Sequence, residues 1–206
     1  MKSPRIQIGV MGGAFVYNKK ALNYAYCVGK NLAQRNCTLV TGATTGIPHA
    51  AVLGAADHGG FSIGISPAKD FVEHVERYKK PIEGLDVIVY TGMGFNGREP
   101  LNINSCDGLI YIGGEFGTLI EFGQGFYEGK ILGVLKGVGG ISDKIEKILS
   151  YMSSHYDSKI IYDSNPENLV NKVISAVKKR KKSLRNIEKK VQNFGRDVKR
   201  LLERKE

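Results

Sequence analysis

The strongest constraint on the fold is a short apolar segment, residues 106–112, that ends directly in two glycines, Gly113 and Gly114. Short apolar segments that end in this way are typical of buried strands in a parallel sheet. Glycines at the carboxyl end of such a strand let a ligand approach the backbone, and the N–H groups that open the next helix attract anions. The segment therefore predicts an α/β sheet with a phosphate site after this strand.

Two side chains just beyond these glycines carry chemistry. Thr118 adds a hydroxyl group, and Glu121 lies one turn into the predicted helix. A carboxylate there either complements the positive end of the helix dipole or takes part in catalysis. The local pattern leaves both interpretations open.

The rest of the chain alternates between strand and helix patterns. Strands are predicted at residues 5–11, 37–40, 61–65, 85–90, 106–112, 131–135 and 159–162, and helices at 18–35, 48–58, 141–152 and from 166 onward. This order predicts a Rossmann-like, doubly wound, mostly parallel sheet of about seven strands with helices on both faces. We expect one nucleotide-binding domain over residues 1–177 and a basic helical tail over residues 178–206.

The charge is concentrated in that tail. The chain has a formal net charge of +10, of which residues 178–206 carry +9. Beyond residue 182 the apolar positions follow a heptad spacing: Leu184, Ile187, Val191, Phe194, Val198 and Leu201. The spacing predicts a helix that packs on its own subunit or pairs with another chain as a coiled coil. We favour this over a nucleic-acid contact, which stays open, because few aromatic residues interleave the charges.

Composition argues against several other classes. No apolar run is long enough for a membrane span, and the N-terminus lacks a signal-peptide core, so we expect a cytoplasmic protein without a membrane partner. The three cysteines, Cys27, Cys37 and Cys106, are far apart and suggest neither disulfides nor a zinc site. The four histidines show no ligand spacing, and we expect no metal.

Four glycine-rich turns follow predicted strands, and the carboxyl ends of such strands meet at one edge of an open α/β sheet. The candidate ligand contacts are Gly12 and Gly13 in the first turn, Gly42, Thr44, Thr45 and Gly46 in the second, and Arg98 in the third. Arg98 is expected on a loop that overhangs the strand ends, where it either forms a surface salt bridge or holds a ligand. The convergence of the turns predicts a single pocket.

Over about residues 5–175 these motifs resemble the Lonely Guy (LOG) family of Rossmann-like proteins, also labelled possible lysine decarboxylases, and the related molybdenum-cofactor carrier proteins. Arg98, then Asp107, then Gly114, Gly117, Thr118 and Glu121 are similar to the RK and PGGxGTxxE signature of the Lonely Guy family. The resemblance implies a phosphoribohydrolase that cleaves a nucleoside 5′-monophosphate into free base and ribose 5-phosphate. It also implies that no cofactor is required and that the protein is a homodimer or higher homo-oligomer.

The resemblance also suggests roles for the candidate residues. Arg98 and Glu121 would be catalytic: Glu121 would stabilise an oxocarbenium-like sugar and activate water, while Arg98 would hold the ribose or phosphate. The 5′-phosphate and the rest of the nucleotide would be bound by Gly12, Gly13, Gly42, Thr44, Thr45, Gly46, Gly114, Gly117 and Thr118.

The chain departs from the signature at three positions. Gly113 replaces a proline, Glu115 replaces a glycine, and Glu99 replaces the lysine after the arginine. Glu99 and Glu115 add two carboxyl groups to the expected pocket, and both are candidates for determining ligand specificity. The combination of the segments TGMGFNGR (residues 91–98) and GGEFGT (residues 113–118) is more similar to a branch near the molybdenum-cofactor carriers.

Two alternatives to the enzyme follow. One is a non-catalytic carrier or sensor that binds a nucleotide or a phosphorylated cofactor of the molybdenum-cofactor type. The other is a nucleic-acid role through the basic tail, in view of a distant similarity to DNA-processing Rossmann proteins. Replacing Glu121 with Gln separates the first alternative from the enzyme, because base release is lost only if Glu121 is catalytic.

Overall fold

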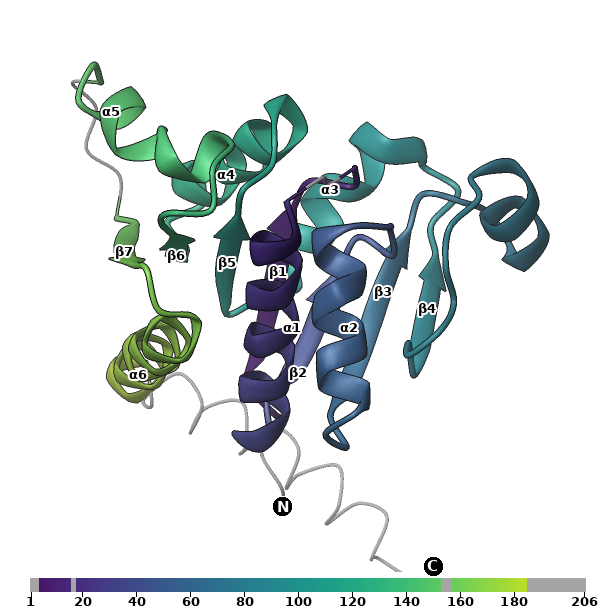
Figure 1. Ribbon diagram of the computed structural model, residues 1–206, viewed down its shortest axis with the longest axis horizontal. Helices are drawn as coiled ribbons and strands as arrows, with labels where there is room; N and C mark the ends of the chain where they lie inside the picture. The colour runs from purple at the N-terminus through teal and green to yellow at the C-terminus, as the bar shows by residue number, and fades with distance from the viewer. Residues whose placement is uncertain (1–3, 16–17, 153–156, 185–206) are drawn as a thin grey trace, which may run out of the picture.

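The computed structural model describes residues 4–15, 18–152 and 157–184. Seven parallel strands form one sheet in the order β4-β3-β2-β1-β5-β6-β7 (Figure 1). The strands are β1 (Gln7–Gly12), β2 (Thr38–Thr41), β3 (Phe61–Ser66), β4 (Val87–Tyr90), β5 (Gly108–Ile112), β6 (Ile131–Leu135) and β7 (Lys159–Asp163). The Rossmann-like parallel sheet predicted from the sequence is confirmed, and each strand begins and ends within two residues of its expected position.

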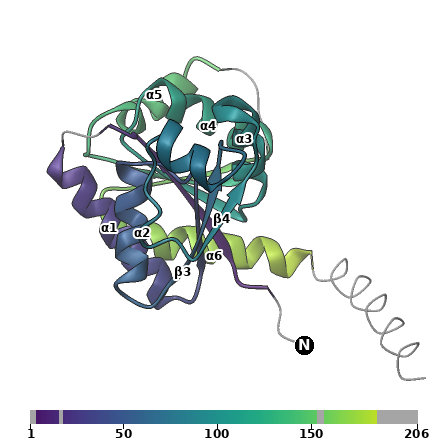
Figure 2. The same ribbon diagram turned by 90° about the vertical axis from the view of Figure 1, so that its right-hand side faces the viewer.

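Helices cover both faces of the sheet (Figures 1 and 2). One face carries α1 (Lys19–Gln34), α2 (Ile47–Ala56) and α6 (Pro166–Ser183), and the other carries α3 (Gly94–Asn104), α4 (Phe116–Tyr127) and α5 (Ile145–Leu149). Successive strand side chains point to opposite faces. In β5, Ile110 and Ile112 therefore pack into the first core, whereas Leu109 and Tyr111 pack into the second.

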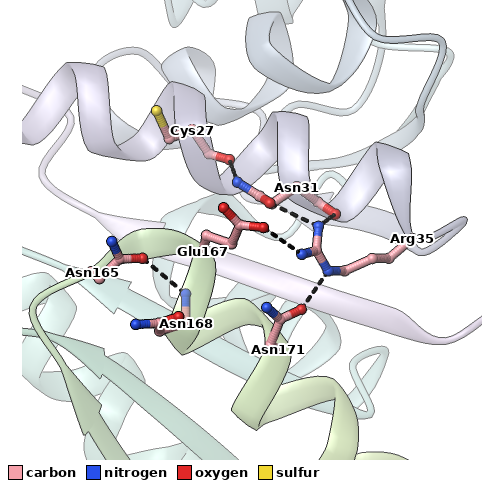
Figure 3. Close-up of polar contacts among 7 residues, drawn as sticks. All are labelled: Cys27, Asn31, Arg35, Asn165, Glu167, Asn168 and Asn171. Atoms are coloured by element: carbon pink, nitrogen blue, oxygen red, sulfur yellow. Dashed lines mark hydrogen bonds and ion pairs between the residues drawn. The ribbon is translucent and has the colours of Figure 1, made fainter.

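Arg35, at the end of α1, ties α1 to α6 (Figure 3). Its Nε donates to Asn171 Oδ1 (2.6 Å), and its Nη2 lies 3.0 Å from Glu167 Oε1. Its Nη1 donates to the side-chain oxygen of Asn31 (2.7 Å), one turn back on α1. The N-terminus of α6 is capped separately, because Asn165 Oδ1 accepts from the backbone N–H of Asn168. These contacts fix α6 against α1 on one face of the sheet.

The structure corrects the prediction for two segments. The helix expected over residues 141–152 is a 3-10 turn, η2 (Ile141–Asp143), followed by the short α5. The carboxylate of Asp143 accepts from the N–H groups of Gly137 and Gly139, so the segment is held as a turn. Arg98 lies on α3 rather than on a loop. The sequence does not predict this helix because it contains two weak helix formers, Gly97 and Pro100. A short π-helical turn, η1 (Glu73–Arg77), was also not anticipated.

The tail is described only at its start. Helix α6 continues past residue 178, where the sequence predicts the tail to begin, and the division into domain and tail stays a prediction. The heptad positions from Ile187 onward lie outside the described residues. In the part of the chain that the structure describes, every helix is too short or too polar to cross a bilayer.

Candidate functional site

A pocket of about 320 Å³ opens at the carboxyl ends of the central strands. β1 lies between β2 and β5, so the connections after β1 and β5 diverge at this point, which is where open α/β sheets bind ligands. The pocket is lined by Met11, Gly12, Gly13, Ala14, Phe15, Gly42, Thr44, Pro48, Lys80, Phe95, Arg98, Glu99, Glu115, Gly117, Thr118 and Glu121. Its volume falls at the lower end of the range for small-molecule sites, about 300–1,000 Å³.

The turns after β1 and β2 are packed against each other. Gly46 has a φ of +73°, and a Cβ atom there would lie 2.3 Å from the carbonyl oxygen of Gly13. The Thr45 hydroxyl donates to the carbonyl oxygen of Ala14 (2.9 Å). Thr45 and Gly46 therefore hold the first turn in place and do not line the pocket, although the sequence placed them among the ligand contacts.

Helix α4 points its N-terminus into the pocket. Gly117 and Thr118 line the pocket, and no side chain caps the first turn of this helix. Gly114 does not line the pocket: it has a φ of +78°, and a Cβ atom there would lie 2.2 Å from Thr118 Oγ1. Its role in the structure is to let Thr118 pack closely at the start of the helix. An uncapped helix N-terminus attracts anions.

Arg98 and Glu121 form a buried ion pair between α3 and α4. Arg98 Nη1 lies 4.0 Å from Glu121 Oε1, and the side chains are only 5% and 12% exposed. The guanidinium group lies directly against Gly42, since a Cβ atom there would come within 2.3 Å of Nη1. Among the described residues, Arg98 Nε and Nη1 have no hydrogen-bond partner. A buried arginine with free donors at a pocket is a ready site for an anion or a sugar hydroxyl.

The environment of Glu121 shifts the pKa of its carboxyl group toward neutral pH. Burial raises the pKa of its carboxyl group to about 7; the Arg98 charge opposes this shift and the Glu99 charge adds to it. Burial likewise raises the pKa of Glu99, again opposed by Arg98. The Tyr111 hydroxyl donates to the carbonyl oxygen of Glu121 (3.1 Å) and so anchors this part of α4. Such a carboxyl group can exchange a proton at physiological pH.

The structure thus brings most of the predicted site residues to one pocket. Those that line it are Gly12, Gly13, Gly42, Thr44, Arg98, Glu99, Glu115, Gly117, Thr118 and Glu121, and those that do not are Thr45, Gly46 and Gly114. The chemical roles assigned to these residues stay predictions. In residues 4–15, 18–152 and 157–184, no three His, Cys, Asp or Glu side chains gather as a metal site would require.

Lys80 and Phe95 are among the pocket residues that the sequence analysis does not predict. Phe95 lies within the third glycine-rich turn, so its position next to Arg98 was available as a signal. Lys80 follows η1 in a segment without any motif, and only the folding of the chain brings it to the pocket. Burial and the nearby Arg98 charge lower the pKa of Lys80.

A model described as the SLOG cluster4 family matches residues 5–170. A protein from Archaeoglobus fulgidus, described as uncharacterized, is 31% identical over 131 residues, which make up 64% of this chain and 80% of that protein.

Solved structures share the fold. The structure of TM1055 matches with a TM-score of 0.73 and 24% identity, over 82% of this chain and 99% of its own. The molybdenum cofactor binding protein from the phototrophic bacterium Rippkaea orientalis matches with a TM-score of 0.67 and 26% identity, over 86% of this chain and 99% of its own. The expected likeness to molybdenum-cofactor proteins is therefore found in the fold, whereas the resemblance to the Lonely Guy family in particular stays a prediction.

Proposed function

The chain belongs to the SLOG cluster4 family, and on that premise we propose that its pocket binds a nucleoside 5′-monophosphate and hydrolyses the N-glycosidic bond. The products are the free base and ribose 5-phosphate. The observation that carries this proposal is the buried pair of Arg98 and Glu121 beside the uncapped N-terminus of α4. The Arg98 guanidinium group and the N-terminus of α4 both attract an anion, and burial raises the pKa of the Glu121 carboxyl group to about 7.

The phosphate belongs at the N-terminus of α4. There Gly117 and Thr118 line the pocket in the first turn of the helix, whose N–H groups and dipole favour negative charge. Glu121 lies one turn further along the same helix, so a phosphate at the first turn brings the attached ribose towards its carboxylate. Arg98, whose Nε and Nη1 have no hydrogen-bond partner among the described residues, donates to the ribose or to the phosphate.

Glu121 then has two tasks in the reaction. As an anion it stabilises the positive charge that develops at C1′ when the bond between C1′ and the base nitrogen breaks. It also accepts a proton from the water molecule whose oxygen forms the new bond to C1′. The bonding electrons leave with the base nitrogen, which takes up a proton from solvent, and Glu121 returns the proton of the attacking water to solvent. Arg98 keeps part of the Glu121 population ionised, because its charge opposes the effect of burial.

The second candidate is a carrier or sensor that binds a phosphorylated nucleotide or cofactor without turnover. The carboxyl groups in the pocket favour this candidate, because Glu99 and Glu115 line the pocket in addition to Glu121. Carboxylates near a phosphate weaken its binding unless they meet donor groups of the ligand. In this alternative Glu121 complements its helix and Glu115 selects the ligand.

The test is to incubate the protein with AMP, GMP, CMP, UMP and an isopentenyl-type AMP and to follow free base and ribose 5-phosphate by chromatography. We expect base release from at least one nucleotide, and its loss in Glu121→Gln. Glu128→Gln is the matched control, because Glu128 ends the same helix and is exposed. Thermal stabilisation by a nucleotide without base release would support the carrier and exclude the enzyme.

A further inference from the structure

One wall of the pocket combines an aromatic ring with an ammonium group. Phe95 is 44% exposed, and the Tyr78 ring packs edge-on against it, with centroids 5.2 Å apart and planes at 89°. Lys80 Nζ lies 5.8 Å from the centroid of the Phe95 ring, at the outer limit of a cation–π contact. Both Phe95 and Lys80 line the pocket. The wall therefore offers a ring that packs against Tyr78, with the Lys80 ammonium group above one side of it.

The two wall residues come from the connections that leave β3 and β4, whereas α4 leaves β5 on the other side of β1. Lys80 follows η1, in the connection that leaves β3, and the start of α3 is held there because the N–H of Gly94 donates to the carbonyl oxygen of Pro67 (3.1 Å). Helix α4 leaves β5, which is three strand positions from β3 in the sheet, or about 14 Å. The pocket thus suits an extended ligand with its anionic group at α4 and a planar ring at Phe95.

Lys80 has no ion pair with any carboxylate among the residues that the structure describes. It is half-buried, and burial lowers its pKa, so its ammonium group has lost part of its hydration. The neighbouring exposed Lys79 does not line the pocket. A partly desolvated donor beside a pocket gains most from an acceptor on the ligand, and an ammonium group can only donate.

We propose that Phe95 and Lys80 form the base subsite and select 6-oxopurine nucleotides, with the base packed on Phe95 and its O6 and N7 atoms facing Lys80 Nζ. A 6-oxopurine presents two acceptors on that edge, whereas adenine presents the N6 amino donor next to N7. Adenine therefore places its N6 amino donor against the ammonium donor of Lys80. This assignment rests on the proposed function, because it takes the phosphate to lie at α4 and the ribose beside Glu121.

The test measures affinities by titration calorimetry for GMP, IMP, AMP and ribose 5-phosphate, in the Glu121→Gln background so that no nucleotide is consumed. We expect GMP and IMP to bind about tenfold more tightly than AMP, the effect of one charge-assisted hydrogen bond. Lys80→Met should remove that preference and leave the affinities for AMP and ribose 5-phosphate within about twofold. Lys79→Met is the matched control and should change none of them.

A second variant tests the ring. Phe95→Ala should weaken binding of all nucleotides about tenfold, because base stacking is insensitive to the base, and should spare ribose 5-phosphate. Equal loss of ribose 5-phosphate in Lys80→Met would place Lys80 at the phosphate and overturn the assignment. Preference for AMP would also overturn it while leaving the proposed function intact. Failure of all four ligands to bind would overturn the proposed function and this assignment together.

Discussion

At the scale of single residues, the ionisation of Glu121 decides the pH dependence of catalysis. Burial raises the pKa of its carboxyl group from 4.5 to about 7, and the proposed reaction needs the anion. We therefore expect the rate of base release to rise about tenfold per pH unit below pH 7 and to level off above it. A pH–rate profile under saturating nucleotide checks this. A rate that falls as pH rises through 7 would instead assign Glu121 the role of an acid.

The same ionisation affects stability. The native state holds the Glu121 proton more tightly than the unfolded chain does, because the pKa in the folded protein is raised. The contribution of this group to stability is therefore fully present below about pH 4.5 and is lost as pH rises through about 7. Urea unfolding of the wild type and Glu121→Gln at pH 5 and pH 8 measures the change. The wild type should lose more stability than the variant between these pH values, and an equal loss in both would contradict this account.

Gly42 keeps the Arg98 guanidinium in the pocket. A Cβ atom at this position would lie 2.3 Å from Nη1 and 2.4 Å from Nη2, so Gly42→Ala must displace the end of the arginine side chain. We expect nucleotide affinity to fall about tenfold or more, with a melting temperature close to that of the wild type, because the side chain can move. Gly123→Ala is the control, since a Cβ there meets nothing within 4 Å. Unchanged affinity in Gly42→Ala would argue against a binding role for Arg98.

At the scale of elements, α1 and α2 touch through their backbones. A Cβ atom at Gly29 of α1 would lie 1.8 Å from the carbonyl oxygen of Ala51 in α2. Gly29→Ala gains up to about 1 kcal/mol of helix propensity but forces the two helices apart. We expect a net loss of stability of about 1–3 kcal/mol in urea unfolding, in contrast to the small gain from Gly123→Ala. A stabilised Gly29→Ala would contradict the close contact of α1 and α2.

The turn at the start of α4 is supported from the neighbouring connection after β6. The buried Ser142 hydroxyl accepts from the N–H of Gly113 (3.0 Å) and donates to the carbonyl oxygen of Gly139 (3.3 Å). Ser142→Ala leaves the buried N–H of Gly113 unpaired, which costs about 1–3 kcal/mol. We expect a lower melting temperature together with weaker phosphate binding, because Gly113 and Gly114 set the position of α4. Ser150→Ala, at an exposed site, is the control.

At the scale of the whole molecule, every residue that lines the pocket lies between Met11 and Glu121. A chain that ends at Leu184 should therefore bind nucleotides with the affinity of the full chain. Any effect of removing residues 185–206 should appear in the oligomeric state, measured by light scattering, or in salt-dependent DNA binding. A loss of nucleotide affinity in the shortened chain would mean that the tail contributes to the site.

The sequence predicts the sheet well because buried parallel strands leave continuous apolar segments bounded by glycines, as in residues 106–112. It misses α3 because Gly97 and Pro100 are poor helix formers, and tertiary contacts rather than local propensity hold that helix. The sequence predicts Thr45 and Gly46 as ligand contacts, whereas in the structure they pack against the first turn. A glycine in a turn has the same sequence pattern in both cases. Lys80 could not be predicted because no motif surrounds it in the sequence, and only the tertiary structure brings it to the pocket.

The most direct test of the account is a crystal structure of Glu121→Gln with GMP, in which the nucleotide stays intact. We predict the phosphate at the N–H groups of Gly117 and Thr118, with C1′ facing residue 121 and an Arg98 donor on the ribose or phosphate. A nucleotide bound elsewhere on the molecule, or in this pocket with its phosphate at Lys80 and its base at α4, would contradict the account.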